Sequence, residues 1–163
     1  MTGAPPVLVL CLGNDFRRDD GVGWRVADLL EADPPMGAVL RKSPAAGLYL
    51  LDELVGFDRA VIVDAIRTGT GTRPAGSVLR LGPEALLGPA GTTPHGAGLP
   101  TVLDAGRRAG LLVPSRIEIV AVEVEEMNTL RVGLTASVEA ALPTAVREVR
   151  AAVRGLQHPP EIA

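Results

Sequence analysis

The stretch Val7-Leu-Val-Leu-Cys-Leu-Gly-Asn14 decides the fold class. Its first six residues are apolar without interruption, which is typical of a strand that is covered on both faces. Gly13-Asn14 then ends the run, because both residue types favour turns. A strand of this kind predicts a largely parallel sheet inside an α/β layer fold.

The rest of the chain alternates between strand-like and helix-like patterns, as the same fold class requires. Further strands are expected near residues 39–40 and at 60–64, 77–81 and 116–122, and helices at 22–31, 48–55, 99–109 and 135–156. Pro143 lies inside the last helix and is expected to kink or split it. Small residues, prolines and one histidine predict a loop at 86–98. We expect one domain with a core from about residue 7 to residue 156 and a flexible tail at 157–163.

Composition and charge narrow the class of protein. The chain has 163 residues, a net charge of −3 and scattered charged side chains, so we expect no nucleic-acid partner, which would need a clustered basic face. The single cysteine, Cys11, cannot form an internal disulfide. No apolar run approaches the ~18 residues of a membrane span, and the first run is too short for the apolar core of a signal peptide. We therefore expect a cytoplasmic protein without a membrane partner, and a monomer by default.

Polar residues gather where the carboxyl ends of the expected parallel strands should meet. Residues 13–23 follow the first strand, Asp64 closes the strand at 60–64, and His95 lies in the loop before the helix at 99–109. In open parallel sheets, functional residues collect at this edge. Two carboxylates, with Asp20 or Asp19 as the first and Asp64 as the second, and the imidazole of His95 suit a divalent ion such as nickel or zinc. Three protein ligands would leave positions open for substrate or water.

Each of these residues also has a purely structural interpretation. Asp19 or Asp20 could cap the helix that begins near Val22, since aspartate is favoured there. Asp64 could bond to loop amides, and His95 could be a structural or solvated side chain. No dinucleotide-binding or phosphate-binding glycine motif is present, and neither is the serine-nucleophile motif G-x-S-x-G. From the residues alone, the prediction is a ligand or metal site.

Five short motifs, in order along the chain, resemble those of the nickel–iron hydrogenase maturation endopeptidases. The resemblance covers about residues 7–156, and its motifs are Leu8–Asn14 with Asp19-Asp20-Gly-Val-Gly23, Ala46-Gly47-Leu-Tyr-Leu-Leu51, Val61-Ile-Val-Asp-Ala65, Pro94-His95 with Gly98-Leu99, and Gly133-Leu-Thr135 with Val138-Glu-Ala140. Each motif is weak alone, but the five together, at family-like separations, are specific.

This resemblance implies a fold, a site and a reaction. The fold is an α/β/α sandwich with a twisted, mostly parallel five-stranded sheet. Asp20, Asp64 and His95 match the three residues of the family that contact metal. The implied reaction is removal of the C-terminal extension of a hydrogenase large-subunit precursor after nickel insertion. The implied metal is nickel carried by that substrate rather than held permanently.

The implied chemistry leaves alternatives open. Nickel could polarise the scissile carbonyl or activate a water, or it could only position the tail while Asp20 or Asp64 acts as general base. A non-catalytic nickel-binding or chaperone-like protein for the immature subunit is the main alternative function. An unrelated amidase or peptidase with its own bound metal is another.

Two departures from the family pattern concern the surroundings of the site. Relatives often carry Gly-Gly-Thr before the Ala-Gly motif, where this chain has Ser43-Pro44-Ala45. The segment Phe16-Arg17-Arg18 is more basic than the apolar filling that is usual in the first loop. Both departures bear on which hydrogenase is the partner more than on the class of reaction.

Overall fold

A five-stranded sheet forms the middle layer of the protein in this computed structural model, which describes residues 5–69, 72–87, 95 and 98–158. The strands are β1 (Val7–Leu12), β2 (Ala38–Ser43), β3 (Arg59–Ile66), β4 (Val78–Leu81) and β5 (Arg116–Glu123). Their spatial order is β2-β1-β3-β5-β4, and all pairs are parallel except β4 with β5. The predicted mostly parallel sheet is therefore confirmed, with β4 as its antiparallel edge strand.

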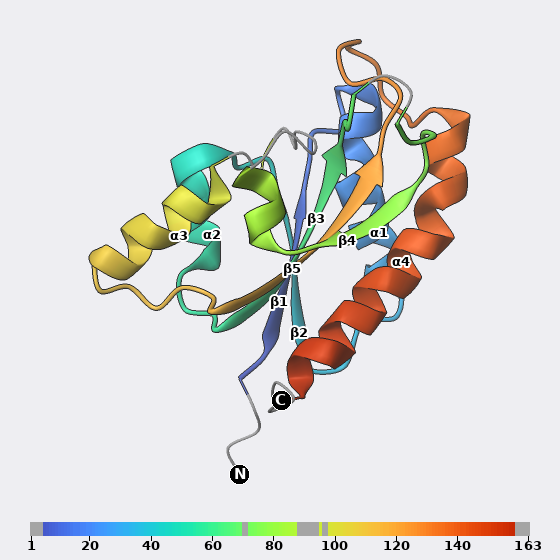
Figure 1. The fold of residues 1–163 in the computed structure, drawn as a ribbon. Coiled ribbons are helices and arrows are strands. Elements are labelled where there is room, and N and C mark those ends of the chain that lie inside the picture. The colour runs from blue at the N-terminus through green and yellow to red at the C-terminus, as the bar shows by residue number, and fades with distance from the viewer. Residues whose placement is uncertain (1–4, 70–71, 88–94, 96–97, 159–163) are drawn as a thin grey trace.

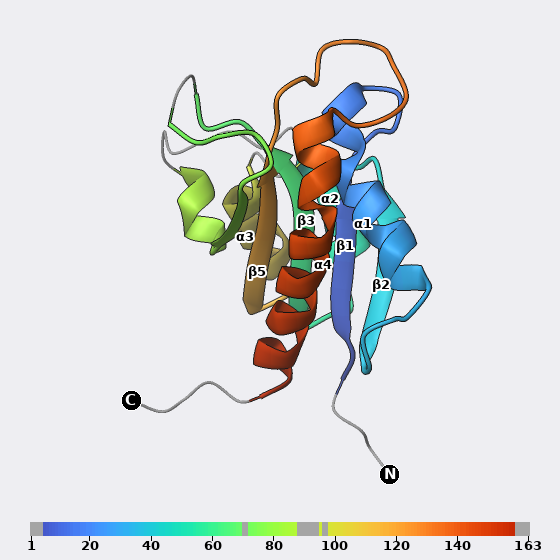
Figure 2. The ribbon, with the colours of Figure 1, turned by 90° about the vertical axis from the view of Figure 1, so that its right-hand side faces the viewer.

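Helices cover both faces of this sheet (Figures 1 and 2). The helices are α1 (Val22–Glu31), α2 (Leu50–Leu54), α3 (Leu99–Arg108) and α4 (Ala136–Gln157), with short 3-10 helices η1 (Arg18–Gly21), η2 (Gly47–Tyr49) and η3 (Pro83–Leu87). One core cluster joins the sheet to α1 and α4, and a second joins it to α2 and α3. The three-layer α/β/α sandwich is confirmed.

The burial of β1 explains its continuous apolar run. Successive side chains of a strand point to opposite faces. Val7, Val9 and Cys11 accordingly pack in the cluster under α1 and α4. Their neighbours Leu8, Leu10 and Leu12 pack in the other cluster. Because both faces of β1 are covered, no position along it tolerates a polar side chain.

Three sequence expectations need correction or extension. The strand near residues 39–40 reaches Ser43, because Arg41 and Lys42 lie on the edge strand β2, where polar side chains reach solvent. The helix at 48–55 begins as the 3-10 turn η2 before α2. Much of the expected loop at 86–98 and most of the expected tail lie outside the described residues.

The expected split at Pro143 is wrong, because α4 runs unbroken from Ala136 to Gln157. A proline inside a helix removes one backbone hydrogen bond. Pro143 lies on the exposed face of α4, whereas its neighbours Leu142 and Ala145 are buried in the core cluster under the helix. Packing of this apolar stripe holds the helix together across the missing bond.

Candidate metal centre and active site

The strand order brings the predicted site residues to one edge of the sheet. β1 and β3 are parallel neighbours, and Cys11 near the end of β1 pairs with Val63, the residue before Asp64. Asp20 lies in η1, just beyond β1. Asp64 lies inside β3, two residues before the end of the strand, and so slightly earlier than expected. His95 lies between η3 and α3 in sequence.

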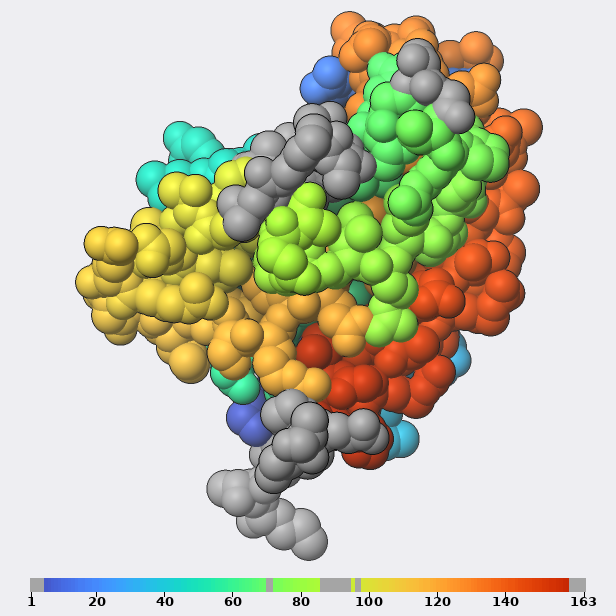
Figure 3. Space-filling view, in the orientation of Figure 1, coloured from blue at the N-terminus to red at the C-terminus, as the bar shows by residue number. Residues whose placement is uncertain are grey.

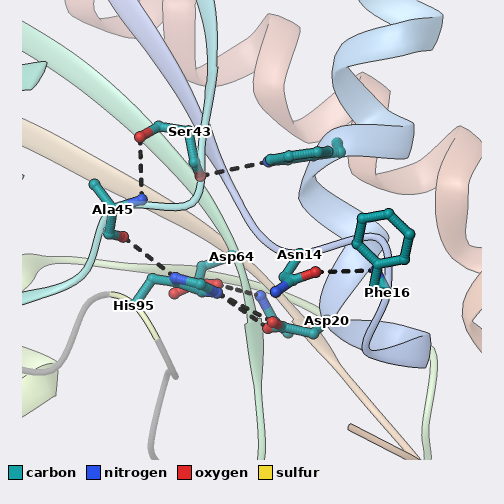
Figure 4. A network of polar contacts seen from close by, with 9 residues as sticks. Asn14, Phe16, Asp20, Ser43, Ala45, Asp64 and His95 are labelled. Carbon is teal, nitrogen blue, oxygen red and sulfur yellow. Dashed lines mark hydrogen bonds and ion pairs between the residues drawn. The ribbon is translucent and has the colours of Figure 1, made fainter. Parts of the chain in front are cut away.

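The three side chains form one compact cluster (Figure 4). One ligand atom from each of Asp20, Asp64 and His95 lies within 4.8 Å of the other two, and all three residues are buried. Nε2 of His95 lies 3.2 Å from both carboxylate oxygens of Asp20. Two carboxylates and one imidazole at this spacing can hold a divalent ion of borderline softness.

The backbone carbonyl of Ala45 sets the orientation of the imidazole. Nδ1 of His95 lies 3.2 Å from this oxygen and must donate to it, since a carbonyl only accepts. In the neutral ring, Nε2 then carries the lone pair, and it faces Asp20. A hydrogen bond of a ligating histidine to a carbonyl is the usual way in which proteins fix the metal-binding nitrogen. Without an ion, a proton has to sit between Nε2 and the carboxylate.

The acid–base properties of the cluster follow from its burial and its charges. Burial raises the pKa of Asp64 to about 7, although the charge of His95 acts in the opposite direction, and the charge of Asp20 adds to the rise. Burial lowers the pKa of His95, but the hydrogen bond to Asp20 and the charges of Asp64 and Asp20 outweigh it, so this pKa lies above its ordinary value. The cluster therefore retains protons that a cation can displace.

Comparison with known proteins identifies the family. Residues 43–152 match the family model described as hydrogenase maturation protease. The chain is also 31% identical to the hydrogenase 2 maturation protease of Escherichia coli (strain K12) over 150 residues, which cover 91% of this chain and 90% of that protein. The chain belongs to the hydrogenase maturation protease family. Asp64 and His95 lie inside the segment that matches the family model, and Asp20 precedes it.

Solved structures support membership of this family of maturation proteases. The hydrogenase maturating endopeptidase HybD from E. coli superposes with a TM-score of 0.73 at 28% identity, with 93% of each chain covered. The [NiFe] hydrogenase maturation protease HybD from Thermococcus kodakarensis gives a TM-score of 0.69 at 24% identity, with 94% of this chain and 99% of that chain covered. At its lower identity, the second comparison supports the fold alone.

The helix-capping interpretation of the paired aspartates is wrong for this maturation protease. The N-cap of α1 is Gly21, and no side chain caps it. Asp19 instead accepts hydrogen bonds from the backbone amides of Glu125, Glu126 and Thr135, at 2.7–3.1 Å, and from the hydroxyl of Thr135. For Asp64 the structural interpretation is supported by hydrogen bonds with backbone groups of Ala65 and His95. These bonds are compatible with its place in the cluster.

The glycines of the first motif allow the loop to pack against the ends of the strands. A Cβ on Gly13 would lie 2.4 Å from the carbonyl oxygen of Asp20, and one on Gly23 would lie 2.2 Å from that of Leu12. Neither distance is possible without moving the backbone. Glycine at these positions therefore lets η1 and the start of α1 sit directly on β1, which brings Asp20 beside Asp64.

Sequence reasoning missed the groups that support the cluster. The Ala45 carbonyl that holds His95 left no signal, because a backbone acceptor is independent of residue type. The indole of Trp24 donates to the Ser43 carbonyl at 3.4 Å, and the Ser43 hydroxyl accepts from the Ala45 amide at 3.1 Å. These bonds connect α1 to the loop that orients His95. Only the Ser-Pro sequence, which is typical of turns, indicated an ordered loop there.

Proposed function

We propose that this protein is the endopeptidase that removes the C-terminal extension of a nickel–iron hydrogenase large-subunit precursor after nickel insertion. The observation that carries the proposal is the buried cluster of Asp20, Asp64 and His95 in a member of the maturation protease family. Two of the relatives described above, a hydrogenase 2 maturation protease and a hydrogenase maturating endopeptidase, support the same reaction.

The donor set suits nickel that arrives with the substrate. Imidazole and carboxylate oxygens are common ligands of borderline divalent ions, and three protein donors leave coordination positions for groups of the precursor. Asp64 and His95 would bind the metal in place of the protons that their raised pKa values favour, and the carboxylate of Asp20 would be the third ligand. Because the ion completes the contact between the two proteins, a precursor without nickel would lack the main point of attachment.

Hydrolysis requires a water to attack the scissile carbonyl carbon, the C–N bond to break and a proton to reach the leaving amine. Nickel bound to the precursor can polarise the carbonyl or lower the pKa of the water. Alternatively, one carboxylate accepts the proton of the water. Either Asp20 or Asp64 can take that role, since both carboxylates lie in the cluster. The second route would make the enzyme an aspartic-type endopeptidase, and in both routes the nickel arrives with the substrate.

A mass measurement on nickel-loaded and nickel-free precursor tests the proposal. We expect loss of a short C-terminal peptide from the loaded form alone. His95→Ala should abolish this loss, because it removes the nitrogen that faces Asp20. His158→Ala is the matched control, since His158 is exposed just beyond the end of α4, and it should cleave like the unmodified protein.

Three results would contradict the proposal in different ways. Stable binding of the loaded precursor with unchanged mass would favour a chaperone-like nickel-binding protein. A stoichiometric metal in the purified protein would favour an amidase or peptidase with its own ion. Cleavage by His95→Ala at the rate of the unmodified protein would show that His95 is not part of the active site.

The proposed setting is the cytoplasm, since processing has to precede any export of the mature hydrogenase, and the proposed working form is a monomer. Within the described residues, no helix is both long and apolar enough to cross a bilayer. Light scattering during gel filtration would test the monomer directly.

A further inference from the structure

Two loops beside the metal cluster expose apolar and basic side chains together. Phe16 is 68% exposed, Leu130 is 83% exposed and Val132 is 66% exposed. Arg17 and Arg131 alternate with them and are also exposed. We call these five residues the basic ledge. The loop after β5, in orange, forms the upper edge of the molecule, next to blue atoms of the N-terminal part of the chain (Figure 3).

The basic ledge is held in place by backbone bonds between its two loops. Arg17 and Arg131 form an isolated parallel β-bridge. The amide of Arg131 donates to the backbone carbonyl of Phe16 at 3.0 Å, and the amide of Arg18 donates to the backbone carbonyl of Arg131 at 2.9 Å. The Arg18 guanidinium donates to the Gly133 carbonyl at 3.0 Å. A rigid surface of this kind loses little conformational entropy when a partner binds.

Backbone strain supports a role for this junction. Arg18 has a φ of +53°, and it is the only non-glycine residue of the described chain in the left-handed region. A left-handed conformation at a non-glycine residue costs roughly 1–3 kcal/mol and persists where the surrounding structure enforces it. Here the enforcing contacts are the bonds of Arg18 to Arg131 and Gly133.

The two exposed arginines are an unfavourable pair without a partner. Like charges placed opposite each other across strands destabilise the pairing. Among the residues that the structure describes, neither guanidinium has a hydrogen bond or an ion pair, although the chain carries a net charge of −3. An anionic group that lies between the two arginines would relieve their repulsion. The ledge therefore has the charge of a binding surface for acid groups.

The position of the ledge connects it to the site. Arg17 precedes Asp20 by three residues, which span at most about 10 Å of extended chain. The amide of Asp20 donates to the Arg17 carbonyl at 3.1 Å, so the separation along this turn is shorter still. A hollow of about 360 Å³ adjoins the ledge, with Val132, Leu134 and Leu29 among its lining residues. Charged side chains line it as well, namely Arg18, Arg25, Asp15 and Asp28, so an apolar side chain of a partner would lie against its Leu29 and Val132 side.

We propose that the basic ledge binds a segment of the substrate protein that carries both acidic and apolar side chains, close to the bond that is cut. This inference rests on the proposed function and concerns which precursor the enzyme accepts. A peptide with alternating acidic and apolar residues matches both components of the ledge. A phosphate backbone would match only the arginines and would leave Phe16, Leu130 and Val132 without apolar contacts.

Charge reversal of both arginines tests the proposal. Arg17→Glu/Arg131→Glu keeps a like-charge pair across the bridge, so we expect its melting temperature to match that of the unmodified protein. For the nickel-loaded precursor, KM should rise about 10- to 100-fold with kcat changed less than about twofold, since surface charges act mainly on encounter and docking. The control is Arg147→Glu/Arg154→Glu on the exposed face of α4, which should leave both constants unchanged.

Two further variants separate binding from a structural role. Arg17→Glu alone places opposite charges across the bridge, so it should raise the melting temperature while it raises KM. A precursor whose acidic residues near the scissile bond are changed to lysine should be cut poorly by the unmodified enzyme and well by the charge-reversed one. Unchanged KM in the double variant, or no such rescue, overturns the proposal.

Binding measurements test the basic ledge separately from the proposed endopeptidase activity. The immobilised precursor, loaded with nickel, is titrated with the unmodified and the charge-reversed protein. If the unmodified protein binds but does not cleave, and the reversal abolishes binding, the ledge stands and the endopeptidase proposal fails. Equal binding by both proteins, or no binding by either, overturns the ledge.

Discussion

Asp19 and Asp20 are adjacent and both buried, yet their carboxylates lie in two regions of opposite character. Asp19 is surrounded by donors, from two amides of the loop after β5 and from the amide and hydroxyl of Thr135 at the start of α4. Asp20 faces an imidazole that lies close to a second acid, Asp64. In the first region a buried charge connects three segments, and in the second region two carboxylates lie around one imidazole, where a cation can bind.

The difference shows how a structural and a functional carboxylate can be told apart. A carboxylate whose oxygens are all occupied by donors has no remaining capacity for a ligand. A carboxylate that faces an imidazole and lies beside a second acid can bind a metal ion together with them. The region around Asp19 also stabilises the loop that carries Asp20. Replacement of either aspartate by asparagine should therefore have different consequences at the two positions.

Asp20→Asn should give the largest effect, on activity. The amide binds a divalent ion far more weakly than the carboxylate does, so we expect cleavage of nickel-loaded precursor to fall about 10³-fold, equivalent to about 4 kcal/mol. The free energy of unfolding should stay within about 1 kcal/mol of the unmodified value, because the substitution is isosteric. Cleavage rates and urea unfolding curves would check both parts. Retained cleavage would place Asp20 outside the reaction.

Asp19→Asn should act on stability instead. The new amide group has to face the amides of residues 125, 126 and 135, so at least one buried donor loses its acceptor. We expect a loss of about 2–4 kcal/mol in the free energy of unfolding, or roughly 4–16 °C in Tm. Thermal unfolding measures it. Cleavage by the folded fraction should fall less than about tenfold, and a larger loss at unchanged Tm would make Asp19 part of the site.

The smallest expected effect is on the pH dependence of the free energy of unfolding, to which the metal cluster contributes and exposed carboxylates do not. Because the pKa of Asp64 is raised to about 7 in the folded protein, the folded state holds a proton that the unfolded state releases above about pH 4. The contribution of the Asp64 carboxyl to the free energy of unfolding is therefore fully present below about pH 4 and is lost as the pH rises from about 4 to 7. The raised pKa of His95 acts in the same direction.

Asp64→Asn removes the contribution of that carboxyl. We expect the variant to be more stable than the unmodified protein at pH 8 by about 1–3 kcal/mol, and equal to it near pH 4. Urea unfolding at the two pH values, without metal, measures the difference. Asp52→Asn, at an exposed position in α2, serves as the control and should show no such pH dependence. A variant that is less stable at pH 8 would contradict the assignment.

Local signals were sufficient to predict most of the fold. β1 is apolar throughout, and β3 and β5 contain apolar runs at 60–63 and 119–122, because both faces of the sheet are covered there; such runs are visible in the sequence alone. The edge strand β2 was predicted too short because its solvent-exposed end is polar. The antiparallel direction of β4 had no sequence signal, and the effect of Pro143 was overestimated because packing along α4 is a long-range property.

The candidate site was predicted as a set of residues but not as a set of contacts. Asp20, Asp64 and His95 could be named from strand ends and family motifs, and the structure brings them together. The function of Asp19 could not be read, since its partners lie more than 100 residues away along the chain. The local sequence suggested that Asp19 caps a helix, whereas its hydrogen bonds in the structure are to residues far along the chain.

The bond between His95 and Ala45 also bears on how freely the site can change during evolution. The acceptor is a main-chain carbonyl, so the residue at position 45 can vary as long as the loop keeps its path. The departure of Ser43-Pro44-Ala45 from the expected family pattern therefore leaves the acceptor of the imidazole in place. A substitution in this loop can therefore change the side chains that face outward and still keep the imidazole in place, provided that the backbone path is unchanged.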